Sequence, residues 1–598
     1  MKKTLLAGAL IGLLSFASSS LAGNYKNFRV SIYTRSYEVQ QMKDLEWLKV
    51  RWDAIEKQLK VDKIYLETHR DFVMPEEPVL VQAKKFFEEK GLLVAGGITT
   101  TVNERNRFQT FCYTNPDHRK KLKEVVEFTA RHFDELILDD FFFTSCKCES
   151  CIRAKGEKSW SRFRLDLMAQ AAQELVIQPA RAVNPKIKVV IKYPNWYDHF
   201  PYLGFNLEAG PKMFDGIYTG TETRDPEYSD QHLQAYHGYS IFRYLENIKP
   251  GGNGGGWVDP PGRRTLDHYA EQLWLTLFAK APEITLFDFS QLNEPIPQGD
   301  GSARPATLVG RVAGYTFEKV DGFLGRLGRP VGLPSYKPFH SSGEDFLQSF
   351  LGMVGLPMDI TPQFPVNAPT IFLTEAAKFD NGIVGKIKGQ LVAGKNVVIT
   401  SGLLKSLQGR GIEDIVELEY TDKKAFPKDY RARWSVIHGD TEITIPQIRY
   451  ATNDAWEIVS SQTRGIGYPI LLQASYAKGL LYVLTVPENF GDLYNLPPEV
   501  LNVIREVMTK DLFVRLEGPA QVSLFVYDNN TFIVESFLPY ATSVRMVVDK
   551  RFTRLKELTM SGGFPGAGGQ GMPGQSRGDR IVFDTFVAPH SYRVFAAE

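Results

Sequence analysis

Along residues 26–325, segments with short apolar runs alternate with segments whose apolar positions recur with helical periodicity. Short apolar runs predict strands at residues 28–33, 63–67, 92–98, 135–141, 187–192, 216–219, 239–245 and 284–289. Most intervals between them have helical periodicity, most clearly at 44–59, 116–132, 161–183 and 266–280. Eight strand–helix units in roughly 300 residues predict a (β/α)8 TIM barrel, with an open doubly wound sheet as the alternative. The barrel is favoured because the units are regular and no phosphate-loop glycine pattern occurs.

Two further domains are expected after the barrel. Residues 341–488 again alternate between strand-like and helical segments, and this part is similar to a small flavodoxin- or glutaminase-like α/β domain. It contains no cysteine, so it lacks the cysteine nucleophile of true amidotransferases. The remaining residues form short strand-like runs between turns, which predict a small C-terminal β-sandwich. We place the barrel at 23–335, the α/β domain at 336–512 and the sandwich at 513–598.

The N-terminus has the pattern of a secretory signal. Lys2 and Lys3 precede an apolar run at 5–16, and the small-residue segment Ser20-Leu21-Ala22 follows. The run is too short for a comfortable membrane span, and no later segment reaches that length. Residues 1–22 are therefore predicted to be a signal peptide. We expect a periplasmic or secreted protein with no membrane partner after cleavage.

The charge balance argues against a nucleic-acid partner. The 598 residues include 70 basic and 69 acidic side chains, well mixed along the chain, for a net charge of +1. Nucleic-acid-binding proteins usually carry a basic stripe or patch instead. Aromatic residues make up 12% of the chain. They suit stacking on sugar rings, but they equally suit ordinary cores.

All four cysteines lie within one short window of the chain, as Cys112, Cys146, Cys148 and Cys151. In a barrel the first would follow the third strand and the other three the fourth strand, and these loops are neighbours. Four thiolates with this spacing can hold one structural Zn²⁺, which leaves no open position for catalysis. Two disulfides are the alternative in an oxidising compartment. Zinc is favoured because the last three cysteines are too crowded to pair comfortably.

Carboxylates at the ends of predicted strands are the candidate catalytic residues, because a barrel carries its chemistry at that face. Asp139 and Asp140 end the fourth strand, Glu222 follows the sixth, and Glu246 ends the expected seventh strand. Strand alternation should send the two aspartates to opposite faces, one into the barrel mouth and the other towards the cysteine loop or the helices. Each glutamate could instead form a structural ion pair with a nearby arginine.

Other polar and aromatic residues at strand ends are candidate substrate ligands. They are Glu67, Arg70, Asn195, Trp196, Trp257 and Asp288. Arg and Asn can bind sugar hydroxyls, and Trp can stack on a sugar ring. The glycine-rich run 250–257 has no Gly-Lys-Ser/Thr ending, so we interpret it as a flexible substrate loop carrying Trp257 rather than as a phosphate cradle.

The chain resembles glycoside hydrolase family 42, the β-galactosidases with a four-cysteine zinc site. The resemblance rests on a lone cysteine followed by C-x-C-x-x-C beyond the fourth strand, and on the order of barrel, glutaminase-like domain and sandwich. It implies a retaining, β-galactosidase-like enzyme with a carbohydrate substrate, and a homotrimer built through the second domain. It also implies Asp140 as acid/base and Glu246 as nucleophile. The family has Asn-Glu where this chain has Asp139-Asp140.

Three other hypotheses fit the same residues. A retaining α-glycosidase would pair Asp140 with Glu222, and a substrate-assisted hexosaminidase would use Asp139 with Asp140. A non-catalytic carbohydrate-binding protein on a decayed barrel would need no converging carboxylates. Retaining enzymes hold two carboxyl groups about 5–5.5 Å apart and inverting enzymes about 6.5–9.5 Å apart. The separation of these groups therefore tests the two-carboxylate hypotheses.

Overall fold

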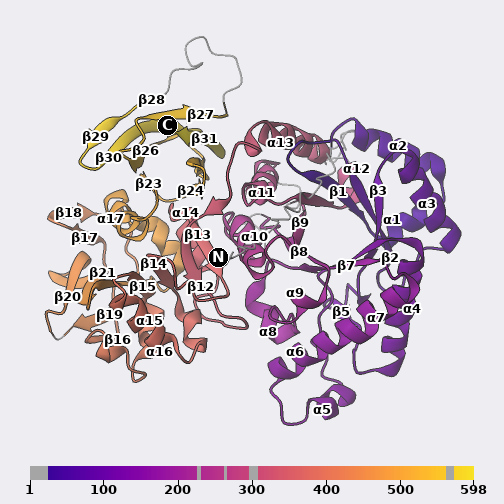
Figure 1. The fold of residues 1–598 in the computed structure, drawn as a ribbon, viewed down its shortest axis with the longest axis horizontal. Helices are drawn as coiled ribbons and strands as arrows, with labels where there is room; N and C mark the ends of the chain where they lie inside the picture. The colour runs from indigo at the N-terminus through magenta and orange to yellow at the C-terminus, as the bar shows by residue number, and fades with distance from the viewer. Residues whose placement is uncertain (1–23, 225–230, 261–265, 295–307, 451, 560–571) are drawn as a thin grey trace, which may run out of the picture.

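The computed structural model describes residues 24–224, 231–260, 266–294, 308–450, 452–559 and 572–598. The expected signal peptide, 1–22, lies outside the described residues and stays a prediction. The described chain forms three parts, with the barrel at the right of Figure 1, the α/β domain at the lower left and the C-terminal strands above it. Within these ranges, no helix is both long enough and apolar enough to cross a membrane.

Eight parallel strands close into a barrel in the order β1-β10-β9-β8-β7-β6-β3-β2. The strands are β1 (Arg29–Thr34), β2 (Lys63–His69), β3 (Leu93–Ile98), β6 (Glu135–Leu138), β7 (Lys188–Tyr193), β8 (Gly216–Gly220), β9 (Asn253–Val258) and β10 (Glu283–Phe287). Large side chains fill the interior, among them Tyr33, Tyr65, Tyr218 and Trp257. The predicted TIM barrel is confirmed.

Helices cover the outside of the barrel, largely where periodicity predicts them. They are α1 (Ser36–Gln41), α2 (Leu45–Glu56), α3 (Glu77–Glu89), α4 (Pro116–His132), α5 (Glu149–Lys155), α6 (Trp160–Ala171), α7 (Gln178–Val183), α8 (Phe200–Leu203), α9 (Gly210–Met213), α10 (His237–Ile248), α11 (Leu266–Phe278), α12 (Phe289–Asn293) and α13 (Val309–Leu324). The Asn115 side chain caps α4 by accepting from the backbone N–H groups of Asp117 and His118. The single helix expected at 161–183 is α6 and α7 joined by a π-helical segment, Ala172–Ile177.

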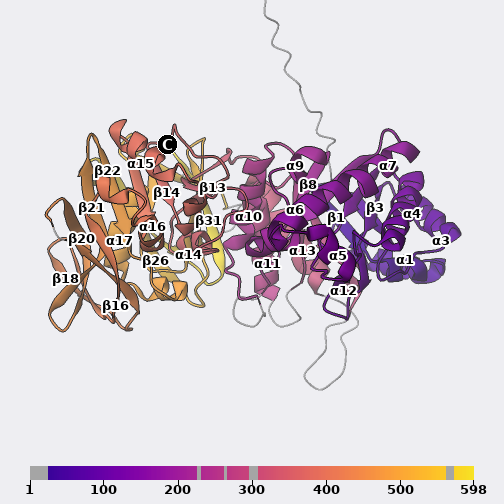
Figure 2. The ribbon, with the colours of Figure 1, turned by 90° about the horizontal axis from the view of Figure 1, so that it is seen from below.

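The seventh strand was predicted at the wrong place. Residues 239–245 form most of helix α10, and the strand is β9, inside the glycine-rich run that we interpreted as a flexible loop. Helix α10 is buried on almost every side because it lies between the barrel and β13 (Met358–Thr361) of the second domain (Figures 1 and 2). Its apolar run is therefore continuous and looks like that of a buried strand.

The second domain is a nine-stranded sheet in the order β13-β12-β14-β15-β22-β21-β20-β17-β18. After β13, these strands are β12 (Leu333–Tyr336), β14 (Thr370–Leu373), β15 (Asn396–Thr400), β22 (Gly479–Leu484), β21 (Ile466–Tyr476), β20 (Ala455–Thr463), β17 (Asp429–Ala432) and β18 (Ser435–His438). A short pair, β16 (Leu418–Ala425) with β19 (Ile445–Tyr450), and helices α14 (Leu347–Met353), α15 (Ile383–Val392), α16 (Ser401–Leu407) and α17 (Pro498–Met508) complete it. Strand β12 belongs to this sheet and spans the boundary that we placed at 335/336.

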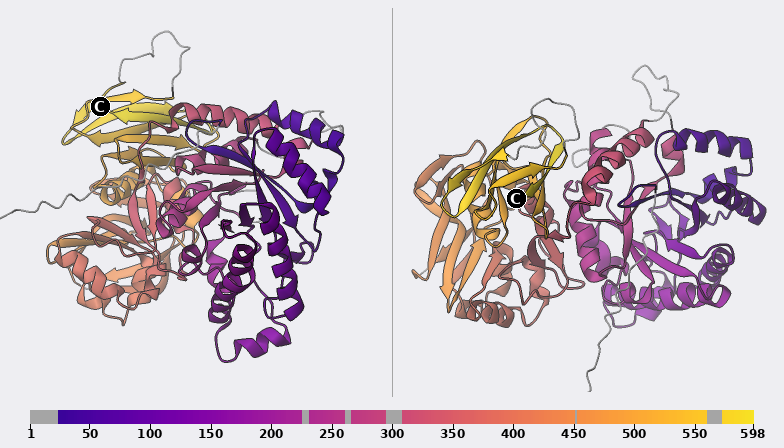
Figure 3. Two further views of the ribbon diagram at one scale, coloured as in Figure 1. Left: turned by 45° about the vertical axis from the view of Figure 1, so that its right-hand side comes forward. Right: turned by 45° about the horizontal axis from the view of Figure 1, so that its top comes forward.

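The C-terminal part consists of two antiparallel sheets, as the predicted sandwich requires. One sheet has the order β11-β24-β25-β31-β27-β28, and the other has the order β23-β26-β30-β29. Its strands are β11 (Pro330–Val331), β23 (Val514–Glu517), β24 (Val522–Tyr527), β25 (Thr531–Ser536), β26 (Thr542–Asp549), β27 (Arg554–Glu557), β28 (Met572–Pro573), β29 (Gln575–Arg577), β30 (Arg580–Val587) and β31 (Ser591–Ala597). Strands β23 to β31, gold to yellow in Figure 3, lie beside the second domain, where β23 contacts helix α17.

Candidate active site

A cavity of about 730 Å³ opens at the carboxyl ends of the barrel strands. Its size is typical of a small-molecule site. The charged residues that line it are Arg70, Glu104, Asp139, Asp140, Lys192, Asp198, Glu222, Arg224 and Asp259, and the large aromatic residues are Phe108, Phe141, Phe143, Trp196, Trp257, Phe287 and Phe346. The cavity therefore combines charged side chains with aromatic rings, a combination that suits a sugar.

Lys192, at the end of β7, holds three carboxylates together. Its Nζ lies 2.8 Å from Asp140 Oδ2 and 3.5 Å from both Asp139 Oδ1 and Glu222 Oε1. The ammonium also lies 4.4 Å from the ring centroid of Trp257. Burial alone would lower the pKa of Lys192, but the three carboxylates raise it above its usual value. Lys192 is therefore a permanent positive charge at the centre of the site.

Asp139 and Asp140 both face this ammonium, so the expectation of opposite faces is wrong. Strand β6 ends at Leu138, and alternation no longer governs the two residues beyond it. Burial raises the pKa of Asp140 to about 7, and the charge of Asp139 adds to this effect. For Asp139, burial is outweighed by Lys192 and Arg70, which hold its pKa below the ordinary value. The neighbours therefore differ in protonation near neutral pH.

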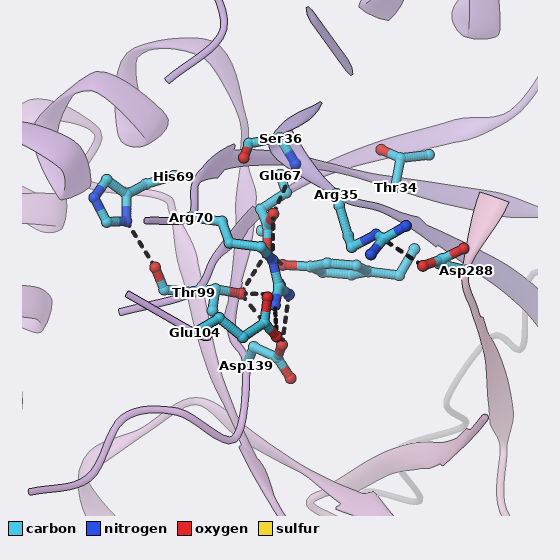
Figure 4. A network of polar contacts seen from close by, with 12 residues as sticks. Thr34, Arg35, Ser36, Glu67, His69, Arg70, Thr99, Glu104, Asp139 and Asp288 are labelled. Carbon is cyan, nitrogen blue, oxygen red and sulfur yellow. Dashed lines mark hydrogen bonds and ion pairs between the residues drawn. The ribbon is translucent and has the colours of Figure 1, made fainter. Parts of the chain in front are cut away.

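Arg70, from the segment after β2, fixes Asp139 from the other side (Figure 4). Its guanidinium lies 3.1 Å from Asp139 Oδ2, 3.0 Å from Glu67 Oε1 and 2.8 Å from Glu104 Oε1. Glu67 is fully buried and also accepts hydrogen bonds from Tyr33 and from the backbone of Ser36. Arg70 reaches the cavity, whereas Glu67 supports it from behind.

Glu222 follows β8, as predicted, and is nearly fully buried. Burial and the negative charges of Asp259 and Asp140 raise the pKa of Glu222 to about 8, although the positive charge of Lys192 acts to lower it. Its Oε2 is buried and has no hydrogen-bond partner among the described residues. Asn195 does not line the cavity; its amide donates to the carbonyl of Glu222 and so holds that loop.

Asp259 is a site residue that the sequence reasoning missed. It directly follows β9 and lines the cavity, 3.0 Å from the guanidinium of Arg224. Its Oδ1 is buried and has no hydrogen-bond partner within the described part of the chain. The signal was present as Trp257-Val258-Asp259, an apolar strand end followed by a carboxylate, but the preceding glycines concealed the strand.

Glu246 and Asp288 do not line this cavity. Glu246 is in the last turn of α10, at the end of the barrel where β9 begins, and accepts a 2.7 Å hydrogen bond from the backbone of Gly251. Its predicted position at the end of the seventh strand is wrong because that segment is a helix. Asp288 follows β10 as expected, but it caps α12 and pairs with Arg35 at 2.8 Å. Trp196 and Trp257 do line the cavity, and Trp257 is a buried strand residue rather than part of a mobile loop.

The four cysteines converge as the spacing predicts. Their sulfur atoms all lie within 4.8 Å of one another, and Cys112 Sγ is 3.7 Å from Cys148 and 3.6 Å from Cys151. A tetrahedral ion with bonds of about 2.3 Å would hold its sulfur ligands about 3.8 Å apart. All four thiols are free, so this cluster fits a single metal ion better than it fits two disulfides. It joins the loop before α4 to helix α5.

Family comparisons cover most of the chain. A family model described as "Probable glycosyl hydrolase, catalytic domain" matches residues 17–326, and one described as "Probable glycosyl hydrolase, C-terminal domain" matches residues 513–597. Between them, residues 328–489 match the second domain of the uncharacterized protein SSO3021. The chain is 24% identical to "Uncharacterized protein SSO3021" of Saccharolobus solfataricus over 589 residues, which cover 89% of this chain and 95% of that protein.

Solved structures share the fold at low sequence identity. The β-galactosidase Gan42B of glycoside hydrolase family 42, from G. stearothermophilus, is 12% identical with a TM-score of 0.63, over 95% of this chain and 98% of that one. A β-galactosidase from Bacillus circulans sp. alkalophilus is 11% identical with a TM-score of 0.61, over 96% and 99%. The exo-β-1,4-mannosidase Op5Man5 from Opitutaceae bacterium strain TAV5 is 10% identical with a TM-score of 0.52, over 81% and 95%.

Proposed function

The chain belongs to the family of probable glycosyl hydrolases, and on this premise we propose that it is an exported, retaining glycosidase acting on β-galactoside-like substrates. The observation that carries the proposal is the convergence of Asp139, Asp140 and Glu222 on Lys192 in an aromatic-lined cavity. A decayed, purely binding barrel would not need buried carboxylates held around one ammonium. The proposed pair is Asp140 as acid/base and Asp259 as nucleophile.

Asp140 suits the acid/base role because its pKa is raised to about 7, so it is partly protonated near neutral pH. In the first step it gives its proton to the glycosidic oxygen while an oxygen of Asp259 attacks the anomeric carbon, and the bond to the leaving group breaks. In the second step the ionised Asp140 takes a proton from water, and the resulting hydroxide displaces Asp259 from the sugar. The sugar leaves with its original anomeric configuration.

Asp259 suits the nucleophile role because it stands at the end of the true seventh strand, the position that the family resemblance gives to this group. It is ion-paired with Arg224, and one of its oxygens is buried without a hydrogen-bond partner among the described residues. A nucleophile must be ionised. Glu222, whose pKa is raised to about 8, is largely protonated at neutral pH and is less suited to the task.

Glu222 as the partner of Asp140, the α-glycosidase arrangement, is the second candidate. Asp140 Oδ2 and Glu222 Oε1 contact the same Nζ at 2.8 and 3.5 Å, so these oxygens are no farther apart than the sum of those distances. That sum is smaller than roughly 6.5 Å, the shortest separation of the two carboxyl groups in inverting glycosidases. The hexosaminidase arrangement has less support, because both oxygens of Asp139 already accept hydrogen bonds.

A screen of aryl α- and β-glycosides followed by azide rescue tests the assignment. Asp140→Asn should lower kcat/KM by about 10²–10⁴-fold, the usual contribution of a general acid. Azide added to Asp259→Ala should give a glycosyl azide of inverted configuration. Azide added to an Asp140→Ala variant with an activated substrate should give retained configuration. Rescue of Asp140→Ala with inversion would instead identify Asp140 as the nucleophile, with Glu222 as the acid of the α-glycosidase arrangement.

Glu246→Gln is the matched control for these variants. It makes the same carboxylate-to-amide change as Asp140→Asn, but at the opposite end of the barrel, so its kcat/KM should equal that of the unaltered protein. Undiminished turnover in Asp140→Asn, or a large loss in Glu246→Gln, would contradict the proposed site.

The metal of the cysteine cluster is proposed to be one structural Zn²⁺. Four thiolates at tetrahedral separations leave no position for a substrate, so Cys112, Cys146, Cys148 and Cys151 would hold the ion and brace the barrel rim. Metal analysis of protein purified without chelators should find one zinc more per chain than in the variant in which Cys148 is replaced by serine. Zinc-free protein with oxidised thiols would favour disulfides.

Export and oligomerisation complete the proposal. Residues 1–22 support export, and N-terminal sequencing of protein recovered outside the cytoplasm should begin at or near Gly23. A homo-oligomer, a trimer by resemblance, is supported by two large exposed side chains on the second domain. Trp434 is 95% exposed and Trp456 is 72% exposed. Sedimentation of the unaltered protein and of Trp434→Ser with Trp456→Ser would test this surface.

A further inference from the structure

A second group of potential metal ligands lies where the barrel meets the C-terminal domain. Asp267 and His268 are in the first turn of α11, and His590 is in the turn between β30 and β31. A carboxylate oxygen of Asp267 and one nitrogen of each imidazole lie within 4.8 Å of one another. Residues more than 300 positions apart therefore bring together a ligand set that one small cation could bridge.

A buried carboxylate orients one of the two imidazoles and lies beside the other. Glu271, one turn further along α11, is 2% exposed. Its Oε1 lies 2.9 Å from His590 Nδ1 and is hydrogen-bonded to it. Its Oε2 lies 3.4 Å from His268 Nδ1, which has no hydrogen-bond partner among the described residues. When Nδ1 of a histidine faces a carboxylate, its Nε2 is left as the electron-pair donor. Such carboxylate–histidine pairs are the usual outer support of a metal site.

We propose that Asp267, His268 and His590 bind a Zn²⁺ ion that ties the barrel to the C-terminal domain, with Glu271 as the residue that positions His590. Two imidazoles and one carboxylate favour zinc over Mg²⁺ and Ca²⁺, which prefer all-oxygen sites. Three protein ligands leave the fourth tetrahedral position for water. Glu271 acts from outside the proposed ligand group, through the hydrogen bond between its Oε1 and His590 Nδ1.

The position of this site connects it to the cavity. Gln272, the residue after Glu271, accepts a 2.7 Å hydrogen bond from the backbone of Arg224 and donates one of 3.1 Å to the carbonyl of Asp259. The first two turns of α11 therefore hold the segments that follow β8 and β9. A metal bridge from α11 to His590 would fix this end of the helix against the C-terminal domain.

Zinc stoichiometry in the full-length protein, with the cysteine cluster intact, tests the proposal. The unaltered protein, dialysed against micromolar free Zn²⁺, should hold one zinc more per chain than His268→Ala and Asp267→Asn. Asp267 is exposed, so Asp267→Asn keeps the hydrogen bond between His590 and Glu271 and should fold normally. His438→Ala is the matched control, because His438 also faces an aspartate, Asp429 at 2.9 Å, but lies in the second domain.

Glu271→Gln tests whether Glu271 positions a ligand or binds the metal itself, because the amide keeps the shape of the side chain but loses its charge. It should retain the site but weaken zinc binding by about 10–100-fold, the usual effect of losing an outer-shell partner. Co²⁺ offers a spectroscopic check. The cysteine cluster gives intense sulfur-to-cobalt absorption, which none of these four variants should change, whereas the second cobalt adds only weak bands.

Two results would overturn the proposal. One is an unaltered protein that holds no more zinc than His268→Ala after this dialysis. The other is a second zinc that persists in both Asp267→Asn and His268→Ala. Neither result bears on hydrolysis, since the proposed site shares no ligand with the glycosidase carboxylates.

Discussion

Lys192 is the residue on which the electrostatics of the cavity depend. A buried ammonium is costly in a protein interior unless opposite charges surround it, and three carboxylates do so here. The benefit is mutual, because the same ammonium lowers the pKa of Asp140 and of Glu222 against the effect of their burial. Without Lys192, both carboxyl groups would be neutral over a wider pH range.

Lys192→Met should therefore move the basic limb of the pH profile of kcat/KM to higher pH. The acid/base must be protonated for the first step, so kcat/KM falls as the pH rises through the pKa of Asp140, which is about 7. Removing the positive charge raises that pKa, and the basic limb should shift to higher pH even though the rate at the optimum falls. The profile of kcat/KM on an aryl glycoside between pH 4 and about 10 measures the shift.

Two control variants accompany this measurement. Lys188→Met makes the same change on the same strand, but Lys188 pairs with Glu135 at the opposite end of the barrel, so the limb should stay in place. Lys192→Arg keeps the positive charge, so the basic limb should stay at the same pH as in the unaltered protein. An unchanged limb in folded Lys192→Met would mean that Asp140 does not control the first step.

At the level of residues, the strand-end rule found much of the cavity. It identified Asp139, Asp140 and Glu222 because each follows an apolar run that the pattern places correctly. It missed Lys192, because a lysine at the end of a strand ordinarily indicates solvent. Nothing local in the sequence shows that three carboxylates from two other segments will surround it.

At the level of elements, the largest error is the position of the seventh barrel strand, which was predicted in the segment that forms helix α10. Helix α10 was predicted as a strand because the second domain covers the side of the helix that would otherwise be polar. Strand β9 was predicted as a loop because it begins Asn253-Gly-Gly-Gly. The small residues are required where helix α11 and neighbouring side chains come close to the strand. Both causes are tertiary contacts, which periodicity within one segment cannot reveal.

The close approach at β9 leads to a stability prediction. A Cβ atom on Gly256 would lie 2.3 Å from Thr276 Cγ2, so Gly256→Ala must displace the Thr276 side chain, which is hydrogen-bonded to Thr221 and Gln272, or move α11 or the strand. Overpacking of this kind costs about 1–3 kcal/mol. The apparent melting temperature should fall, and kcat/KM should fall with it because Asp259 is three residues away.

Gly322→Ala provides the comparison, since nothing lies within 4 Å of the added Cβ and the residue is inside helix α13. Replacing a helical glycine by alanine should stabilise the protein by about 0.5–1 kcal/mol. If Gly256→Ala were as harmless as Gly322→Ala, the segment would be the mobile loop that its composition suggests.

At the level of the whole molecule, the three parts share one core. A single cluster of buried apolar side chains includes Tyr236 of the barrel, Leu333 of the second domain and Phe525 of the C-terminal domain. The Phe525 ring lies 5.3 Å from that of Tyr236 and 4.7 Å from that of Tyr239. Separate domains joined only by linkers would not bury aromatic rings against one another in this way. The chain should therefore unfold cooperatively.

Phe525→Ala tests this cooperativity. Removing a buried phenylalanine costs about 3–5 kcal/mol, and here the loss falls on a contact between parts. Calorimetry should show the whole unfolding transition at a lower temperature, and the temperature at which hydrolysis is lost should fall by a similar amount. Phe586→Ala removes a ring that is 70% exposed on the same domain and should change neither. A C-terminal transition that moves alone, with the inactivation temperature of the barrel unchanged, would show that the parts unfold independently despite their common core.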